Sequence, residues 1–299
     1  MRQPFVLHHD FVKNPVMRLG CFSDLHHDHP AHDKQQCDRD FEEAANLDCR
    51  ILINGDISDL IFSGDPRYTA ARDDGAVDAV INRALKESAN RLTPYADHID
   101  MIGVGNHEAS LLKHRGVDFV GLLINELNHH RSKAHPPIYH GGYRGFFRVQ
   151  FHRANWSGSQ VWYYDHGRGG SSPVTKGMID ISRLMKDWSA DVYWLGHKHN
   201  SISDDDAQCR HLNARNRIVT QRRLAFYTAG YASLLQSRDY DSDGFVLDYA
   251  EERFNGTSSQ GNAIVSYTHS LKSYISLKGS RTQTDSVRRR LEKSIEIIG

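Results

Sequence analysis

Short apolar runs alternate along the first half of the chain with longer segments whose apolar residues recur at helical spacing. Short runs that are apolar on both faces are typical of strands buried in parallel sheets. We therefore predict strands over 16–23, 51–53 and 99–104, and helices over 34–47, 76–92, 108–114 and 117–129. Strands that alternate with helices predict a layered α/β fold.

After Pro136 and Pro137 the pattern changes to aromatic and β-branched runs that are separated by Gly, Asn and Ser. Runs of this kind predict strands, which we expect at 138–140, 146–151, 161–164, 192–195, 224–228, 244–249 and 263–267. One amphipathic helix is predicted over 174–188, and a basic amphipathic helix is predicted at 285–298.

Three observations bear on domain organisation. Residues 1–15 show no clear periodicity, so we expect an irregular N-terminal extension. Residues 57–75 carry two clusters of turn residues and are interpreted as an insertion or lid. Because the sequence shows no internal repeat and no low-complexity linker, residues 16–299 are interpreted as one domain.

Polar residues follow five of the predicted strands at the point where each strand ends. They are Asp24 and His26, then Asp56 and Asp59, then Asn106, His107 and Glu108, then His166, and finally His197 and His199. Ligands of open α/β sheets bind at the carboxyl ends of the strands, so we expect these side chains to converge. Carboxylate, amide and imidazole together suit Mn, Fe, Ni or Zn better than Ca or Mg. The absence of cysteine argues against a closed structural zinc site.

The spacing within these blocks has a physical reason. Residues i and i+2 of an extended segment point the same way, so Asp24 and His26 can reach one ion, as can His197 and His199. A glycine precedes Asp56, Asn106 and His197. Glycine lets the chain turn sharply and approach an ion without a Cβ in the way.

In this order, the blocks Asp-x-His, Gly-Asp-x-x-Asp, Gly-Asn-His-Glu, His and Gly-His-x-His resemble the signature of the calcineurin-like metallophosphoesterase superfamily. They extend from Asp24 to His199, which is more than half of the chain. The resemblance implies a four-layer α/β/β/α sandwich with two mixed β-sheets flanked by helices. It also implies a dinuclear metal site at the strand ends, with two divalent ions, Mn²⁺ being preferred over Fe, Zn or Ni.

The resemblance further implies a role for each residue. One ion would be bound by Asp24, His26, Asp56 and His199, and the other by Asp56, Asn106, His166 and His197. Asp56 would bridge the two ions. His107 would stabilise or protonate the leaving oxygen, and the carboxylate of Asp59 would orient His107.

Some of these residues have competing interpretations. We prefer His166 to His140 and His152, which also follow predicted strands, because an apolar strand leads directly into His166. Glu108 is interpreted as the start of a helix, where a carboxylate favours the helix dipole. His27 is interpreted as a rim residue and a weak candidate for substrate binding. Arg168 lies between glycines, and a phosphate contact and an exposed loop position are equally compatible with its sequence.

Composition narrows the class of protein. The 37 basic and 37 acidic residues balance, which argues against a protein that coats polyanions, although a local basic patch is compatible with this balance. The arginines at 210, 215, 217, 222 and 223 are read as a solvated surface or as contacts to a nucleic-acid backbone. No apolar run is long enough for a membrane span. The four cysteines lack close pairing and there is no secretory signal, so we expect a cytoplasmic location.

The sequence predicts a dinuclear-metal-dependent phosphoester hydrolase that attacks its substrate with metal-activated hydroxide. A nucleotide or nucleic-acid phosphodiester is the preferred substrate. The Ser/Thr protein phosphatase branch of the superfamily is disfavoured, because Leu60-Ile61 replaces its Arg-Gly and His27 replaces its glycine. A phosphomonoesterase of the same fold is the first alternative, and a non-catalytic metal-binding interaction protein is the second. The oligomeric state is left open.

Overall fold

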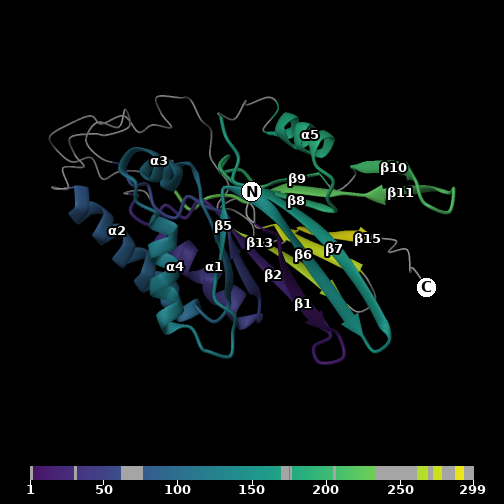
Figure 1. Cartoon of the computed structure of the whole chain (residues 1–299), viewed down its shortest axis with the longest axis horizontal. Helices are drawn as coiled ribbons and strands as arrows, with labels where there is room; N and C mark the ends of the chain where they lie inside the picture. The colour runs from purple at the N-terminus through teal and green to yellow at the C-terminus, as the bar shows by residue number, and fades with distance from the viewer. Residues whose placement is uncertain are drawn as a thin grey trace.

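Two mixed β-sheets make up the centre of the fold in the computed structural model (Figure 1), which describes residues 3–29, 32–61, 77–169, 175, 177–204, 207–232, 261–268, 272–277 and 287–292. The larger sheet has the order β15-β14-β13-β2-β3-β4-β5. Its strands are β2 (Val16–Phe22), β3 (Arg50–Ile53), β4 (Ile99–Gly103), β5 (Tyr139–Gly142), β13 (Ala263–Thr268), β14 (Lys272–Leu277) and β15 (Val287–Glu292).

The second sheet has the order β1-β6-β7-β8-β12-β9. Its strands are β1 (Phe5–Asp10), β6 (Arg144–Arg153), β7 (Trp156–Asp165), β8 (Val192–Leu195), β9 (Ile202–Asp204) and β12 (Leu224–Tyr227). Two further strands, β10 (Gln208–Leu212) and β11 (Ile218–Arg222), pair with each other and, among the described strands, with no other, so they form a separate two-stranded ribbon. The helices are α1 (Lys34–Asn46), α2 (Val77–Leu92), the 3₁₀ helix η2 (Thr93–Tyr95), α3 (Asn106–Arg115), α4 (Phe119–His130) and α5 (Met178–Asp187).

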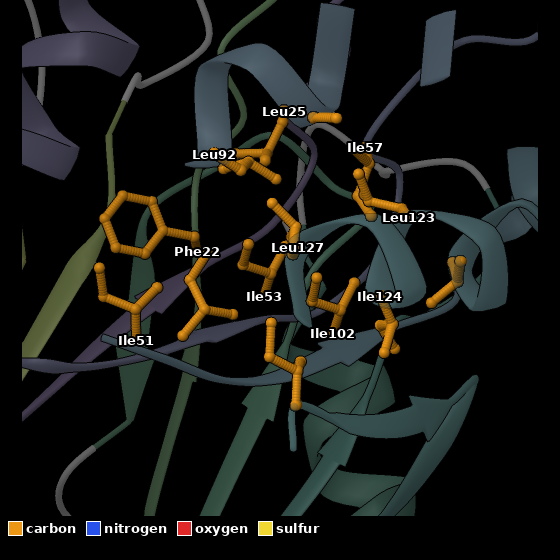
Figure 2. Close-up of a cluster of buried hydrophobic side chains, with 14 of the residues drawn as sticks. Phe22, Leu25, Ile51, Ile53, Ile57, Leu92, Ile102, Leu123, Ile124 and Leu127 are labelled. Atoms are coloured by element: carbon orange, nitrogen blue, oxygen red, sulfur yellow. The ribbon is translucent and has the colours of Figure 1, made fainter. Parts of the chain in front are cut away.

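The alternation of side chains along the strands separates the molecule into layers. On β2, Met17, Leu19 and Cys21 face the second sheet and join a core that includes Trp162 and Trp194. Residues that point to the other face of the larger sheet pack against helices in a second core, and this core includes Phe22, Ile51, Ile53, Ile102, Leu123 and Leu127 (Figure 2). Adjacent residues of a strand point to opposite faces, so one strand contributes to both cores.

A third core covers the outer face of the second sheet. Tyr163, Tyr193 and Tyr227 pack there with Ile181 of α5. Helices α1, α2 and α4 lie together at one side of the molecule in Figure 1, and α5 lies apart from them. The order of layers is therefore helices, sheet, sheet, helix, and the predicted four-layer α/β/β/α sandwich is confirmed.

Two predictions about the ends of the chain are wrong. The sequence predicts an irregular extension over 1–15, but residues 5–10 form β1, which pairs in parallel with β6 at a sheet edge. Within this strand only Leu7 is buried, so its apolar pattern is too short to reveal it. The sequence also predicts a helix over 285–298, but residues 287–292 form β15, which pairs antiparallel with β14. Pairing with a neighbouring strand outweighs a weak local preference for helix.

The predicted helices before residue 130, and the one at 174–188, are confirmed with shifted ends. The predicted strand 244–249 and residues 62–75 of the predicted insertion lie outside the described residues. Within the described part of the chain, no helix combines the length and the apolar character that a membrane span requires.

Candidate metal centre

The loops that follow β2, β3, β4, β7 and β8 meet at one place between the two sheets. Strands β2, β3 and β4 are parallel neighbours, so their carboxyl ends lie at the same edge. The same holds for β7 and β8 in the second sheet. Hydrogen bonds join the two edges, because the side-chain amide of Asn54 donates to the carbonyl of Asp165 at 3.1 Å and the backbone N–H of His197 donates to the Asp24 carboxylate at 2.9 Å.

Asp56 occupies the middle of the polar cluster at this junction. Its Oδ2 lies 3.0 Å from Nε2 of His166 and 4.0 Å from Nε2 of both His26 and His107. Asn106 belongs to the same group, because its Oδ1 lies 3.2 Å from Nε2 of His166. The carboxylate of Asp56 thus reaches imidazoles that come from both sheets.

The candidate ligand atoms form three neighbouring groups around Asp56, and the group of His26, Asp56 and His107 shares residues with each of the other two. Asp24, His26 and His199 place one ligand atom each within 4.8 Å of one another. Asp56, His166 and His197 do the same on the other side. The structure therefore brings together all seven residues that the sequence predicts as metal ligands, which are Asp24, His26, Asp56, Asn106, His166, His197 and His199. Ligation itself stays a prediction.

Three histidines are oriented by hydrogen bonds at Nδ1. His26 bonds to the carboxylate of Asp59 at 2.6 Å, His166 donates to the carbonyl of Asn54 at 2.7 Å, and His107 donates to the backbone carbonyl of Asp59. A carbonyl only accepts, so the proton sits on Nδ1 in the latter two residues. Each ring then presents Nε2 to the cluster, as metal-binding histidines do.

The role predicted for the carboxylate of Asp59 is only partly matched. Its Oδ1 bonds to His26, whereas the backbone carbonyl of the same residue accepts the N–H of His107. The residue orients both rings, but it does so with different groups. Sequence spacing does not reveal this, because it cannot distinguish a side-chain acceptor from a backbone acceptor on one residue.

The buried carboxylates and imidazoles of the site shift one another's pKa values. Burial opposes a charge on His26, but the hydrogen bond and the charge of Asp59 raise the pKa of His26 to about 9. Burial likewise opposes a charge on His166, but Asp56 raises the pKa of that imidazole to about 10. Burial would raise the pKa of Asp56, and the neighbouring His166 and His107 hold it well below its usual value. The cluster therefore favours positive charge beside Asp56, and protons supply that charge in the absence of metal.

The nitrogen and oxygen donors of the cluster are suited to bind divalent metal ions. Among the described residues, Nε2 of His26 and Nδ1 of His199 are buried without a hydrogen-bond partner. Buried polar atoms of proteins nearly always have partners, so these nitrogens indicate a missing ligand. Imidazole nitrogens beside carboxylate and amide oxygens are donors that suit borderline divalent ions.

The backbone at the site is strained. Five of the predicted ligands have a positive φ, which side chains other than glycine rarely adopt: Asp24 (53°), His26 (50°), Asp56 (50°), His197 (72°) and His199 (51°). Strain of this kind concentrates where a fold must aim several side chains at one point. The glycine at 105 is required by the same crowding, because a Cβ there would lie 2.0 Å from Oδ1 of Asp56.

Glu108 has a larger role than the sequence interpretation assigns. It lies in the first turn of α3, as expected, but it is buried and accepts the N–H of Ile57 at 2.7 Å and of Gly105 at 2.8 Å. It also accepts the N–H of Asp56 at 3.1 Å. The carboxylate thereby joins the loop after β3 to the loop after β4. Its position three residues after Gly105 lets it accept the N–H of that glycine, which is one half of a capping box, and this spacing is the signal that the sequence offers.

Other candidate residues have clear positions. His27 is not at the rim, because it is 1% exposed and its Nδ1 lies 3.1 Å from Oγ of Ser88 in α2. Arg168 is exposed, and its carbonyl accepts from the amine of Lys198 at 3.1 Å. The two alternatives to His166 have partners outside the cluster. His140 lies 3.3 Å from the carboxylate of Asp118, and His152 lies 3.4 Å from His8. The preference for His166 agrees with its position in the cluster.

No family model matches the sequence. No curated protein matches it either. Among solved structures, the chain is similar to GAP50, the anchor in the inner membrane complex of Plasmodium, with 11% identity, a TM-score of 0.44, and coverage of 94% of this chain and 90% of that one.

Two other solved structures are similar to the chain. One is a conserved uncharacterized protein of Streptococcus pneumoniae that is described as a predicted phosphoesterase, with 11% identity, a TM-score of 0.31, and coverage of 92% and 98%. The other is a metallophosphoesterase from Sphaerobacter thermophilus, with 13% identity, a TM-score of 0.35, and coverage of 85% and 84%. At such identities and TM-scores, these similarities do not place the chain in a family.

Proposed function

We propose that this protein is a metal-dependent phosphoester hydrolase with a dinuclear centre. The observation that carries the proposal is that neighbouring groups of donor atoms surround Asp56. Asp24, His26 and His199 would hold one ion and Asn106, His166 and His197 the other, with Asp56 between them. When bound, two ions would activate water as the nucleophile and would neutralise the charge that develops on the phosphoryl group.

The protein groups then perform positioning and proton transfer. Asp59 and Asn54 fix the rings of His26 and His166, so the two donors need no reorientation when an ion binds. The backbone carbonyl of Asp59 holds the proton of His107 on Nδ1 in the metal-free state. Nε2 of His107 faces the centre, and when protonated it donates to the leaving oxygen.

The preferred substrate is a phosphodiester of a nucleotide or nucleic acid. The ribbon of β10 and β11 supports this choice, because its exposed arginines at 210, 215, 217 and 222 occur in a stretch of 208–222 without an acidic residue. Arg168 supports it as well, since it is an exposed cation two residues from His166. Arginine makes bidentate contacts with phosphate groups.

The test uses purified protein that is freed of metal with a chelator and then reloaded with Mn²⁺, Fe²⁺, Zn²⁺ or Ni²⁺. Bis-p-nitrophenyl phosphate and p-nitrophenyl phosphate are compared first, followed by cyclic nucleotides and by single- and double-stranded nucleic acids. We expect faster hydrolysis of the diester, with Mn²⁺ as the best ion. We also expect His107→Asn to lower kcat by about 10²–10⁴-fold with unchanged metal content. The control His140→Asn removes an imidazole that bonds outside the cluster.

The outcomes separate the alternatives. Equal or faster monoester hydrolysis would show a phosphomonoesterase of the same fold. Bound metal without hydrolysis of any tested ester would favour a non-catalytic metal-binding protein. Activity that survives His107→Asn would disprove the assigned mechanism. A cytoplasmic location is proposed with this function and is tested by fractionation of the source cells.

A further inference from the structure

A second group of potential ligands lies apart from the centre at Asp56. The ligand atoms of His27, His32 and Cys37 lie within 4.8 Å of one another, and all three residues are buried. They come from the loop after β2 and from the first turn of α1. Although His26 and His27 are adjacent, their rings bond to different groups, because His26 reaches Asp59 while His27 reaches Ser88 of α2.

The nitrogens of this group lack the partners that burial demands. Nε2 of His27 is buried without a hydrogen-bond partner in the described part of the chain, and the ring nitrogens of His32 are buried with no partner beyond a backbone contact at Leu25. The two rings are 5% exposed or less and meet edge to face, with centroids 5.4 Å apart. Aromatic packing explains the contact between the rings, but it leaves the nitrogens unsatisfied.

The remaining groups suit a metal ligand set. The contact between Nδ1 of His27 and Oγ of Ser88 fixes that ring, as the outer hydrogen bond of a metal-binding histidine does. Cys37 supplies sulfur at the same point, and two imidazoles with one thiolate are donors for zinc and related ions. The centre at Asp56, by contrast, contains only nitrogen and oxygen donors.

We propose that His27, His32 and Cys37 bind one further transition-metal ion of the zinc class. On binding, the thiol of Cys37 loses its proton to the solvent, and the ion gains one thiolate and two neutral imidazoles. Such an ion ties the loop that carries Asp24 and His26 to α1, and through Ser88 to α2. It supports the loop of the dinuclear centre without taking part in its chemistry.

The test relies on the sulfur ligand, which distinguishes this site from the centre at Asp56 among the described residues. The full-length protein is freed of metal and titrated with Co²⁺, and the thiolate-to-cobalt charge-transfer band is recorded in the near ultraviolet. X-ray absorption of the zinc-loaded protein is then expected to show a Zn–S distance of about 2.3 Å. Cys37→Ser should lose both signals, and His32→Gln should weaken or shift the cobalt band.

Two matched controls use the other cysteines. Cys49→Ser changes a thiol that is as buried as Cys37, and Cys209→Ser changes one that is partly exposed. Both should keep the cobalt band and the Zn–S signal. Absence of both signals in the wild-type protein overturns the proposal, whether or not any variant folds. So does a band that persists in Cys37→Ser, that disappears in Cys209→Ser, or that is unchanged in His32→Gln.

Discussion

Glu108 offers the sharpest test of how the two loops of the candidate centre are joined. Its Oε2 accepts the N–H groups of Gly105 and Asp56, and its Oε1 accepts those of Ile57 and Ser58. In Glu108→Gln, one of the two oxygens becomes an NH₂ group. Either orientation of the amide then turns a donor toward at least one of these N–H groups.

The expected loss in the free energy of unfolding follows from the number of backbone N–H donors that lose their acceptor. A buried donor without a partner costs about 1–3 kcal/mol. Glu108→Gln leaves at least one such donor and should lower the free energy of unfolding by about 1–3 kcal/mol. Glu108→Ala leaves four, and at the lower limit of about 1 kcal/mol each it should cost about 4 kcal/mol or more. Because the hydrogen bonds fix the backbone of Asp56, metal affinity should also fall, by about 10–100-fold.

Urea unfolding of the metal-free protein, followed by circular dichroism, measures the free energy, and titration with Mn²⁺ measures the affinity. Glu126→Gln is the matched control, since that carboxylate lies on the surface of α4 and pairs with His130. Its stability and metal affinity should equal those of the wild type. If Glu108→Gln were as stable as Glu126→Gln, the carboxylate would not be what joins the loops.

Three further predictions concern the metal centre and its substrate. Replacement of His166 by Asn should remove one of two bound Mn²⁺ ions, as measured by elemental analysis, whereas His140→Asn should retain both. The raised pKa values of His26 (about 9) and His166 (about 10) mean that the metal-free protein carries both protons at pH 8, so metal binding should release protons. Calorimetry in two buffers of different ionisation enthalpy measures that release, and a heat that is independent of the buffer would contradict it. Arg210→Glu combined with Arg222→Glu should weaken the binding of single-stranded DNA without changing the hydrolysis of bis-p-nitrophenyl phosphate, and unchanged DNA affinity would remove the ribbon from the proposed interface.

The same two pKa values set the pH dependence of stability for the metal-free protein. Both folded-state values lie above the ordinary value of 6.5, so the two imidazoles stabilise the fold in their protonated form. This contribution is complete below about pH 6.5 and is lost as the pH rises through 9 to 10. Metal binding removes the dependence, because the ion replaces the protons.

The sequence could predict which residues converge because the carboxyl ends of parallel strands lie at one edge of a sheet, although the blocks adopt positive φ instead of the expected extended backbone. Asp24 and His26 lie two residues apart after a buried strand, and parallel strands bring their ends together whatever the remaining chain does. The resemblance to a known superfamily then indicated which block pairs with which. The same reasoning fails for Glu108, whose partners at 56 and 57 lie 51 or more residues away.

Local sequence patterns also failed to predict the second ligand group and the strands at the two ends of the chain, which depend on contacts between distant segments. The group of His27, His32 and Cys37 has spacings of no recognised motif, and it forms where the residues after β2 meet the first turn of α1. The strands at the two ends of the chain have weak patterns of their own, and pairing with neighbours forms them. A sequence pattern indicates the structure that a segment prefers in isolation. The buried group and the two terminal strands depend instead on contacts with neighbouring segments of the fold.

The ligand residues also hold one another's backbones. The carboxylate of Asp24 accepts the N–H of His197, Oδ1 of Asp56 accepts that of His107, and the carbonyl of Asp56 accepts that of His26 at 3.1 Å. These bonds offset backbone strain of about 1–3 kcal/mol for each residue with a positive φ. Loss of one ligand therefore disturbs the position of others as well as removing a donor. Paired substitutions such as Asp24→Asn with His197→Asn should consequently be non-additive in metal affinity, because Asp24→Asn already weakens the contact that holds the backbone of His197.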